Sequence, residues 1–521
     1  MKRLFFILLF FITSLLYVQT GERIENRTEA EDAYEYVMMV EHGAEHHWYY
    51  HQHHLLYGTL VTGFDFFLEG LGLHLETIQM MRLLSALCAS GSLFLFAFFC
   101  YKRYSLRPFS SLLATLFLAS CYGFWRYAAE AEIPLVASFF VLAALYFSTD
   151  IRKKRASFYL GIIFSVISVL IHIMNAVAVF AAIPCFYWLA HQKKRAVSHL
   201  LLSALGITLV YLWIGASHEV YAAENQIGFN FSFGAFIKAI VAFCQCIISC
   251  DFMMGFKSIR VLLAELFAHR MLLEEFYYGE RLSRAHILIS TSTFMLVFVG
   301  FLGAVIRAIW VWFNRLTHRQ RLYLPEGKAA LFVAFIFFVG YAGLLLVVEP
   351  GNPELWIMGL IPFALLFCGC ILLPLTSDNR LWIPFLMIIF LNFHNGKAID
   401  LLGDLSKDYQ YQKAKPLLEM VKKKDVIVSA GNPVFERYLR YHTKAEVWYL
   451  YHMKADELSI RMFEDVEGDI YVCGDVLSPP KSLVVRFSEK SKAITSFATQ
   501  IRASLVPHRV DEFGGIYKWV R

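Results

Sequence analysis

The sequence predicts a polytopic α-helical membrane protein of about 11 spans, followed by a small C-terminal α/β domain outside the membrane. Three observations support this fold class. Of the 521 residues, 58% are hydrophobic and only 17% are charged, which is too little polar surface for a water-soluble globule of this size. Long apolar runs recur along the chain, and the pattern changes after residue 395.

Eleven apolar runs approach the roughly 17 to 25 residues that a helix needs to cross a hydrocarbon layer of about 30 Å. The runs at 157–173 and 175–190 are nearly continuous, and we interpret them as a hairpin because one long helix there would invert everything after it. The eleven predicted spans are 4–20, 78–100, 109–127, 133–149, 157–173, 175–190, 199–216, 286–312, 328–348, 354–374 and 380–394.

Basic residues orient these spans, because short loops rich in Lys and Arg stay on the cytoplasmic side. A cytoplasmic N-terminus places the basic clusters at 2–3, 102–107, 152–155, 193–195 and 315–328 on one side. The first run is expected to stay as an anchor, since VQTGERIE after it lacks a small-residue cleavage site. The sequence thus predicts an integral protein of the plasma membrane, the bacterial inner membrane being the expected location.

The same orientation predicts which segments are external. A membrane domain of residues 1–394 would carry an external loop at 21–77 and an external insertion at 217–285. An external domain of residues 395–521 would follow, because strand-length runs such as DVIVSAGN, AEVWYLY and DIYVCGDV alternate with helical patterns such as PVFERYLRYH. That alternation indicates an α/β domain with a partly parallel sheet.

The stretch EDAYEYVMMVEHGAEHHWYYHQHHLLY, residues 31–57, holds six of the 18 histidines. Apolar periodicity in its first half predicts an interfacial helix interrupted at Gly43. If the second half is also helical, His47, His51 and His54 share one face. A metal site is an open alternative there, but no carboxylate stands in clear ligand register, so no metal is expected.

Three further polar islands lie at predicted span ends on the same external side. Ionisable groups at such depth are costly unless they pair or serve a site, so four islands on one face predict one cavity. The three islands contain Arg126 and Glu132 in GFWRYAAEAEIP, His172 and Asn175 in LIHIMNAV, and Glu349 and Asn352 in VVEPGNPELW.

Three of these stretches form a recognisable set: DAYEYV…HHLLYGTL, GFWRYAAEAEIP and EPGNPELWI. They resemble motifs of the GT-C class of membrane glycosyltransferases, and more narrowly of prokaryotic relatives of its protein O-mannosyltransferase-like branch. The resemblance covers roughly residues 25–180 and 345–375. It departs where Gln52 and His53 replace a proline and where Pro134 replaces a tyrosine. It implies an acidic first external loop, a catalytic cavity at the outer leaflet and an external C-terminal domain.

The implied reaction moves a sugar from a polyprenyl-phosphate-linked donor to an acceptor (protein, lipid or glycan) at the outer face of the membrane. Inverting transfer needs one carboxylate to take the proton of the attacking hydroxyl, and Asp32 is the expected base. The leaving phosphate needs cationic or N–H donors, for which Arg82, Arg126, His54 and His172 are candidates. Further substrate-binding candidates are His53, Tyr57, Glu132, Asn175, Glu349 and Asn352.

Retaining chemistry would need a second carboxylate as nucleophile, and Glu132 and Glu349 are the candidates for it. No cofactor or metal is expected, because a preformed lipid phosphate leaves without the divalent ion that a nucleotide diphosphate requires. The expected partners are the lipid-linked donor, an unknown acceptor and membrane lipids. The net charge of +6 reports topology rather than a nucleic-acid partner.

Other interpretations stay open. A flippase or exporter of lipid-linked sugars would show internal repeats or charges at mid-span, and a metal-uptake protein would place ligands there; the sequence shows neither pattern. The candidates also have structural interpretations: Asp32 as one acid of a solvated loop, the arginines as interfacial anchors, Glu132 and Glu349 as helix caps, and His172 as a side chain bonded to a backbone carbonyl at the hairpin.

Overall fold

The computed structural model describes most of the chain. The described residues are 2–24, 32–150, 155–220, 232–249, 256–266, 282–317, 327–372, 381–406, 408–480, 483–484, 487–511 and 513–520. They divide into two compact units. The first unit comprises residues 1–25, 36–250 and 284–400, and the second comprises residues 26–35, 251–283 and 401–521. The basic residues at 152–154 and 318–326 lie outside the described residues.

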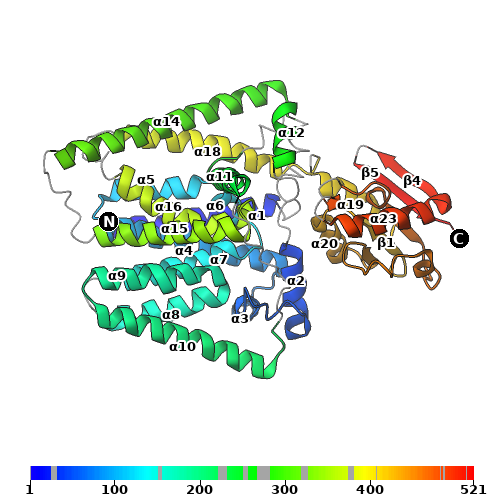
Figure 1. Ribbon diagram of the computed structural model, residues 1–521, viewed down its shortest axis with the longest axis horizontal. Helices are drawn as coiled ribbons and strands as arrows, with labels where there is room; N and C mark the ends of the chain where they lie inside the picture. The colour runs from blue at the N-terminus through cyan, green and yellow to red at the C-terminus, as the bar shows by residue number, and fades with distance from the viewer. Residues whose placement is uncertain are drawn as a thin grey trace. The chain divides into compact units, whose positions relative to one another are not determined.

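The first unit is helical, and its long helices run side by side in Figure 1, with α3 at the end opposite the N-terminus. Its helices are α1 (Lys2–Ile24), α2 (Ala33–His42, which begins in the second unit), α3 (Tyr57–Gly70), α4 (Thr77–Arg103), α5 (Pro108–Ser120), α6 (Tyr122–Tyr127), α7 (Pro134–Ser148), α8 (Arg155–Ile171), α9 (Ile183–Leu189), α10 (Lys193–Ser217), α11 (Phe233–Ile247), α14 (Arg284–Thr317), α15 (Gly327–Val348), α16 (Pro353–Phe367) and α18 (Trp382–Leu402).

Short irregular turns complete several of these helices. The 3₁₀ turns η1 (Gly43–Glu45) and η2 (Ile173–Asn175) follow α2 and α8, and the π-helical segments η3 (Ala178–Ala182) and η5 (Cys368–Leu372) adjoin α9 and α16. Gly43 has φ +59°, a left-handed conformation that glycine adopts without strain. The predicted interruption of the helix at Gly43 is therefore confirmed.

The described parts of all eleven predicted spans fall on helical segments, and residues 373–374 and 380 lie outside the described residues. Six helices among the described residues are long and apolar enough to cross a membrane: Phe6–Ile24, Thr77–Arg103, Lys193–Ser217, Ala329–Val348, Pro353–Leu372 and Pro384–Leu402. Several others, including α5, α7 and α8, are apolar but shorter. The protein is thus a polytopic helical membrane protein, and the count of eleven spans stays a prediction.

Close helix packing in the first unit uses small residues. A Cβ on Gly91 of α4 would meet the Phe139 ring of α7 at 2.8 Å, and one on Gly161 of α8 would meet Ser148 Oγ of α7 at 2.5 Å. Small side chains let helix backbones approach where lipid supplies no hydrophobic drive. These contacts fix α4, α7 and α8 against one another.

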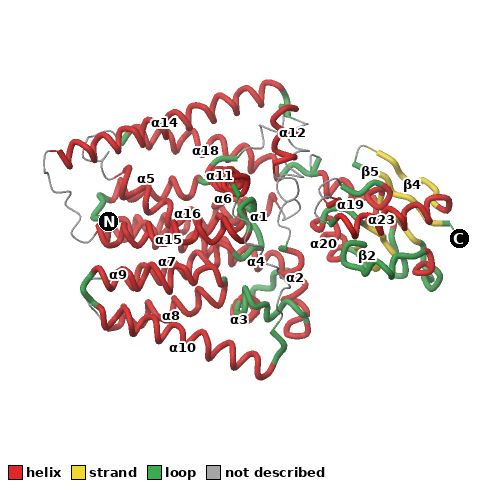
Figure 2. Tube along the Cα trace, in the orientation of Figure 1, coloured by secondary structure: helices red, strands yellow, loops and turns green. Residues whose placement is uncertain are grey.

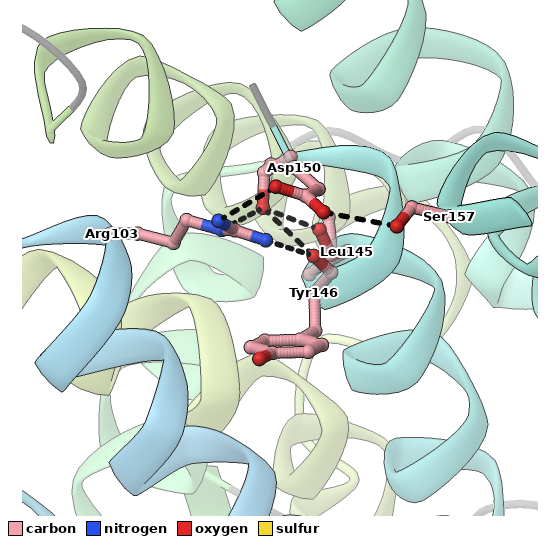
Figure 3. Close-up of polar contacts among 6 residues, drawn as sticks. Arg103, Leu145, Tyr146, Asp150 and Ser157 are labelled. Atoms are coloured by element: carbon pink, nitrogen blue, oxygen red, sulfur yellow. Dashed lines mark hydrogen bonds and ion pairs between the residues drawn. The ribbon is translucent and has the colours of Figure 1, made fainter. Parts of the chain in front are cut away.

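A buried ion pair closes one end of the same three helices (Figure 3). Arg103 on α4 donates from Nη2 to the Tyr146 carbonyl at 2.9 Å and from Nε to Thr149 Oγ1 at 3.2 Å. Its Nη1 lies 3.5 Å from Asp150 Oδ1, and Ser157 on α8 donates to Asp150 Oδ2 at 3.0 Å. The guanidinium therefore bonds carbonyl and hydroxyl groups at the C-terminal end of α7, where the helix dipole favours a cation.

The second unit contains a five-stranded sheet, and strands occur nowhere else in the described chain (Figure 2). Its strands are β1 (Val426–Ser429), β2 (Glu446–Tyr449), β3 (Ile470–Cys473), β4 (Leu505–Asp511) and β5 (Gly514–Trp519), and its helices are α12 (Lys257–Leu266), α19 (Tyr409–Met420), α20 (Pro433–His442), α21 (Gly474–Leu477) and α23 (Ser488–Ile501). The order is β2-β1-β3-β5-β4, with β1 parallel to β2 and β3 and with β5 antiparallel to its neighbours. Sequence alternation predicted this partly parallel sheet.

Local sequence explains how α20 follows β1. The strand VIVS is buried at all four residues, as expected for a strand inside a parallel sheet. Asn432 then caps α20 by accepting a hydrogen bond from the Val434 amide, and Pro433 occupies the first helical position, where a missing N–H costs nothing. The succession of a strand in DVIVSAGN and a helix in PVFERYLRYH, expected from the sequence, is confirmed.

Candidate active site

The histidine-rich loop between α2 and α3 is built from turns, not from a continued helix. The expectation that His47, His51 and His54 share a helical face is therefore wrong. Gly43 ends the helix, and the backbone amides of Trp48 and His53 instead bond to the Nδ1 atoms of His46 and His51. Such local side-chain bonds compete with helical ones. No metal-holding group of three His, Cys, Asp or Glu residues occurs within the described ranges.

The loop packs on the tip of the predicted hairpin, which joins the first polar island to the third. The Ile173 amide donates to the His53 carbonyl and the Leu56 amide to the Leu170 carbonyl, each at 3.0 Å. The rings of His54 and His172 lie 4.8 Å apart in an edge-to-face arrangement. Burial, followed by the charges of His172, His51 and His53, holds the pKa of His54 well below its usual value. His54 is thus neutral at physiological pH.

The third island also serves the backbone. The amide of Met174 donates to His172 Nδ1 at 3.3 Å, and Asn175 Nδ2 donates to the carbonyls of Ala137 and Ser168 at 3.3 and 3.1 Å. Asn175 is fully buried. Both side chains therefore bond backbone groups: His172 accepts from an amide of η2, where a carbonyl partner was expected, and Asn175 donates to carbonyls of α7 and α8. Their part in substrate binding stays a proposal.

The second island is a buried charged cluster after α6. Arg126 Nε lies 3.0 Å from Glu130 Oε1, and Arg126, Glu130 and Glu132 are all less than 3% exposed. The guanidinium also lies 5.6 Å from the centre of the Tyr127 ring. Taking such charges out of water costs several kcal/mol per ion, and ionisable groups buried in a membrane protein are the usual basis for proposing a functional site.

Tyr57 connects this cluster to the histidine-rich loop. Its hydroxyl is buried, and burial together with the Glu132 carboxylate raises the pKa of Tyr57 well above its usual value. The ring centres of Tyr57 and Tyr36 of α2 lie 5.6 Å apart, and those of Tyr36 and His54 lie 6.3 Å apart. The first and second islands are thus neighbours in the first unit.

The fourth island caps α16. Asn352 accepts from the Glu354 amide at 3.0 Å and donates from Nδ2 to Glu349 Oε2 at 3.0 Å. The sequence analysis did not select Glu354. The signal for it was its position in the first helical turn, directly after Asn352 and Pro353. The helix α16, whose first turn carries Glu354, packs against α6, which carries Arg126 and Tyr127. This packing brings the fourth island close to the second.

Arg82 lies on α4 beside the same cluster. A Cβ on Gly21 of α1 would meet the Ala129 carbonyl oxygen at 2.7 Å and Arg82 Cδ at 3.6 Å. The end of α1, the start of α4 and the loop 128–132 therefore converge. We call the convergent set the polar cluster: His53, His54, Tyr57, Arg82, Arg126, Glu130, Glu132, His172, Asn175, Glu349, Asn352 and Glu354.

Asp32, the expected base, belongs to the second unit with residues 26–35. Its Oδ1 lies 2.5 Å from Nη1 of Arg437 on α20, and its side chain is 29% exposed. Glu35, one turn further on, lies 3.6 Å from both Arg437 Nε and Arg440 Nη1. The sequence contained no sign of this pairing, because the partners are 405 positions apart.

No family model matches the chain, and no curated protein matches it. Solved structures are similar to it over nearly its whole length. ArnT from Cupriavidus metallidurans, bound to undecaprenyl phosphate, is 11% identical with a TM-score of 0.48, covering 99% of this chain and 98% of ArnT. The Archaeoglobus fulgidus oligosaccharyltransferase, in complex with Zn and sulfate, is 10% identical with a TM-score of 0.49, covering 98% of this chain and 72% of that one.

A second structure of the Archaeoglobus fulgidus enzyme AglB contains an inhibitory peptide and a dolichol-phosphate; it is 10% identical, with a TM-score of 0.46, and covers 100% of this chain and 75% of AglB. ArnT and AglB are GT-C glycosyltransferases, the class whose motifs the sequence resembles. At these identities and TM-scores the similarity does not by itself assign a function, which depends on the side chains described above.

Proposed function

We propose that this chain is a membrane glycosyltransferase that moves a sugar from a polyprenyl-phosphate-linked donor to an acceptor hydroxyl at the outer face of the membrane. The observation that supports this most is the convergence of the four islands into one polar cluster with a buried centre at Arg126, Glu130 and Glu132. Three of those islands also resemble glycosyltransferase motifs. Side chains that form one site must lie close to one another. Side chains that only cap separate helices need no such contacts.

The proposed chemistry is a single inverting displacement. Asp32 takes the proton of the acceptor hydroxyl, the acceptor oxygen bonds to the anomeric carbon, and the bond from that carbon to the phosphate oxygen breaks. The polyprenyl phosphate leaves with the bonding electrons. Arg82 and Arg126 face the negative charge that grows on it, and preorganised cationic donors of this kind supply much of the rate enhancement of an enzyme.

The order of residues along α2 supports Asp32 as the base. Asp32 immediately precedes the helix, and Tyr36 lies one turn further along it. Tyr36 contacts His54 and Tyr57 of the polar cluster. Asp32 thus comes, along the chain, about one helical turn before a residue that contacts the polar cluster.

An apolar cavity of about 450 Å³ offers room for an isoprenoid chain. Its lining contains no polar side chain and comes from α1, α4, α7 and α8. Phe94, Phe139, Phe147 and Phe164 supply most of the aromatic surface. In the proposal this cavity receives part of the donor's polyprenyl tail while the phosphate stays at the polar cluster.

Purified protein in bilayers, given undecaprenyl-phosphate-linked radiolabelled hexose or aminosugar, tests the proposal. We expect label to pass to acceptors in added cell membranes, with free undecaprenyl phosphate released in equal amount. Arg126→Gln serves as the inactive control. Movement of the intact donor across the bilayer without any transfer would identify a flippase instead and overturn the enzymatic assignment.

A further inference from the structure

Asp32 has a fixed partner in the second unit, Arg437. The ion pair joins Oδ1 of Asp32 to Nη1 of Arg437 at 2.5 Å. Arg437 is only 10% exposed at its side chain, whereas Asp32 is 29% exposed. Within the part of the chain that the structure describes, the contact leaves Oδ2 of the carboxylate without a hydrogen bond. One oxygen is thus held while the other stays open.

We propose that Arg437 is a positioning residue for sugar transfer: it holds the carboxylate of Asp32 by one oxygen so that the other faces the acceptor hydroxyl. This inference rests on the proposed function, because it takes Asp32 to be the base. Arg437 itself touches no substrate. It makes the C-terminal α/β domain part of the catalytic apparatus rather than an appended module.

Arg437 stands on a capped helix that directly follows a buried strand. It lies in the second turn of α20, whose start is capped by Asn432 directly after the buried strand β1. Its Nε lies 3.6 Å from Glu35 Oε2, so one planar guanidinium faces two carboxylates on the same short segment. Arginine suits this task because its donors stand in a fixed fork, whereas lysine presents one mobile charge.

Aromatic packing fixes the segment from the other side. The centre of the Tyr34 ring lies 5.4 Å from that of Tyr438 and 5.5 Å from that of His442, both on α20. Both contacts are edge-to-face. Edge-to-face packing is the favoured geometry for such rings. Residues 32–35 are therefore attached to α20 by an ion pair at each end and by a tyrosine packed edge-to-face between them.

Stability alone does not explain the Asp32 contact. Glu35 is 6% exposed and already faces both Arg437 and Arg440, so the segment is anchored without Asp32. An ion pair with a carboxylate exposed to this degree adds little net stability. Orientation of the carboxylate is the effect that remains, and misplacing a catalytic group by about 1 Å costs a reaction as much as 100-fold.

Hydrogen exchange on the full-length protein in bilayers tests the contact without any activity. Arg437→Gln should speed exchange in the peptide 32–42, while Arg440→Gln, one turn further along α20 and not bonded to Asp32, should change it less. Equal effects of the two variants would overturn the assignment of Arg437 to Asp32.

Transfer kinetics with undecaprenyl-phosphate-linked sugar test the positioning. Arg437→Gln should lower kcat about tenfold to 100-fold with the KM for donor nearly unchanged, Arg437→Lys should recover part of that loss, and Arg440→Gln should stay within about twofold of the parent. In an Asp32→Asn background, Arg437→Gln should lower kcat no further. Arg437 acts by positioning the Asp32 carboxylate, and that carboxylate is already absent.

The two proposals fail in different ways. Full transfer by Asp32→Asn would remove Asp32 as the base and with it the proposed mechanism. A large loss in Asp32→Asn with no loss in Arg437→Gln would overturn the positioning of the base and leave the mechanism standing. Additive losses in the double variant would show that Arg437 acts independently of Asp32, which contradicts the inference as well.

Discussion

At the scale of single residues, burial changes the pKa of one carboxyl on α20, Glu436. Glu436 on α20 is 2% exposed, and burial raises its pKa from 4.5 to about 7 even though Arg440 and Arg437 act in the opposite direction. Arg440 Nη1 is 3.5 Å from Glu436 Oε1, too long for a strong hydrogen bond. Desolvation therefore outweighs the arginines at this position.

The raised pKa of Glu436 predicts a pH dependence of stability. A carboxyl whose pKa is higher in the folded state stabilises the fold fully below pH 4.5, and this contribution disappears as pH rises through 7. We expect the opening free energy of α20 in the full-length protein, measured by hydrogen exchange, to fall by roughly 2 to 3 kcal/mol between pH 4.5 and pH 8.

Glu436→Gln should flatten that dependence, because an amide does not titrate. Burial and the nearby arginines lower the pKa of His452, so this group acts in the opposite direction and stabilises the fold above pH 6.5. His452→Gln in the same measurement separates the two. A profile that Glu436→Gln leaves unchanged would contradict the assignment.

Asp32 is the residue on which the reaction depends. Asp32→Asn keeps the size of the side chain but removes its ability to accept a proton, so we expect transfer to fall roughly 100-fold to 10,000-fold with donor binding retained. Glu29→Gln and Glu31→Gln, in an acidic stretch outside the described residues, are the controls for bulk charge. Equal and modest losses in all three would move the assignment to Glu132 or Glu349.

The cationic side chains of the polar cluster bear on metal dependence. Arg82 and Arg126 can neutralise a leaving phosphate without an ion, so we expect sugar transfer to persist in EDTA. The measurement is the initial rate before and after chelation. Loss of transfer with rescue by Mg²⁺ or Mn²⁺ would instead make the acidic and histidine-rich loop a coordination site.

At the scale of elements, the hydrogen bonds and ion pair of Arg103 hold α4, α7 and α8 together at one end. Arg103 and Asp150 are both about 6 to 7% exposed at their side chains. Removing one partner of a buried pair leaves an uncompensated charge, which costs about 3 to 5 kcal/mol.

Arg103→Gln should therefore lower the midpoint of thermal unfolding in detergent by several degrees, and Asp150→Asn should lower it as well. The matched control is Lys102→Gln at the neighbouring exposed position, which should have almost no effect. Because the hydrogen bonds and ion pair of Arg103 include no residue of the polar cluster, the folded fraction of Arg103→Gln should keep its transfer rate per molecule. A stable Arg103→Gln protein would refute the structural assignment.

At the scale of the whole molecule, the predicted orientation has a structural counterpart in the first unit. Arg103 and Asp150 meet Ser157, and Arg195 lies over the Phe158 ring at 5.4 Å, so basic loops from separate places in the sequence gather together. The positive-inside rule assigns such an end to the cytoplasm. The polar cluster is built from other helix ends and loops.

Reporter fusions test this orientation. A fusion after Lys194 should report the cytoplasm, and one after Lys415 should report the opposite compartment, because the predicted spans between them place the C-terminal domain outside. A fusion after Arg107 is the control for the cytoplasmic signal. The same compartment for Lys194 and Lys415 would rule out the eleven-span arrangement.

The sequence by itself determined the membrane class, the positions of the helices, the turn from β1 into α20 and the four polar islands. These features follow from local composition and periodicity, which depend only on residues a few positions apart. The helical face of His47, His51 and His54 failed as a prediction because side-chain bonds of His46 and His51 to nearby amides replaced the helical ones.

Only the tertiary structure decided which islands touch and what holds the expected base. Glu354 joins the cluster because α16 packs against α6, and Arg437 meets Asp32 across 405 positions. Such pairs depend on how helices and strands pack, and packing is set by the whole chain. A charge in a sequence shows the same letter whether it is solvated or buried, so its partner and its desolvation become visible only in the folded molecule.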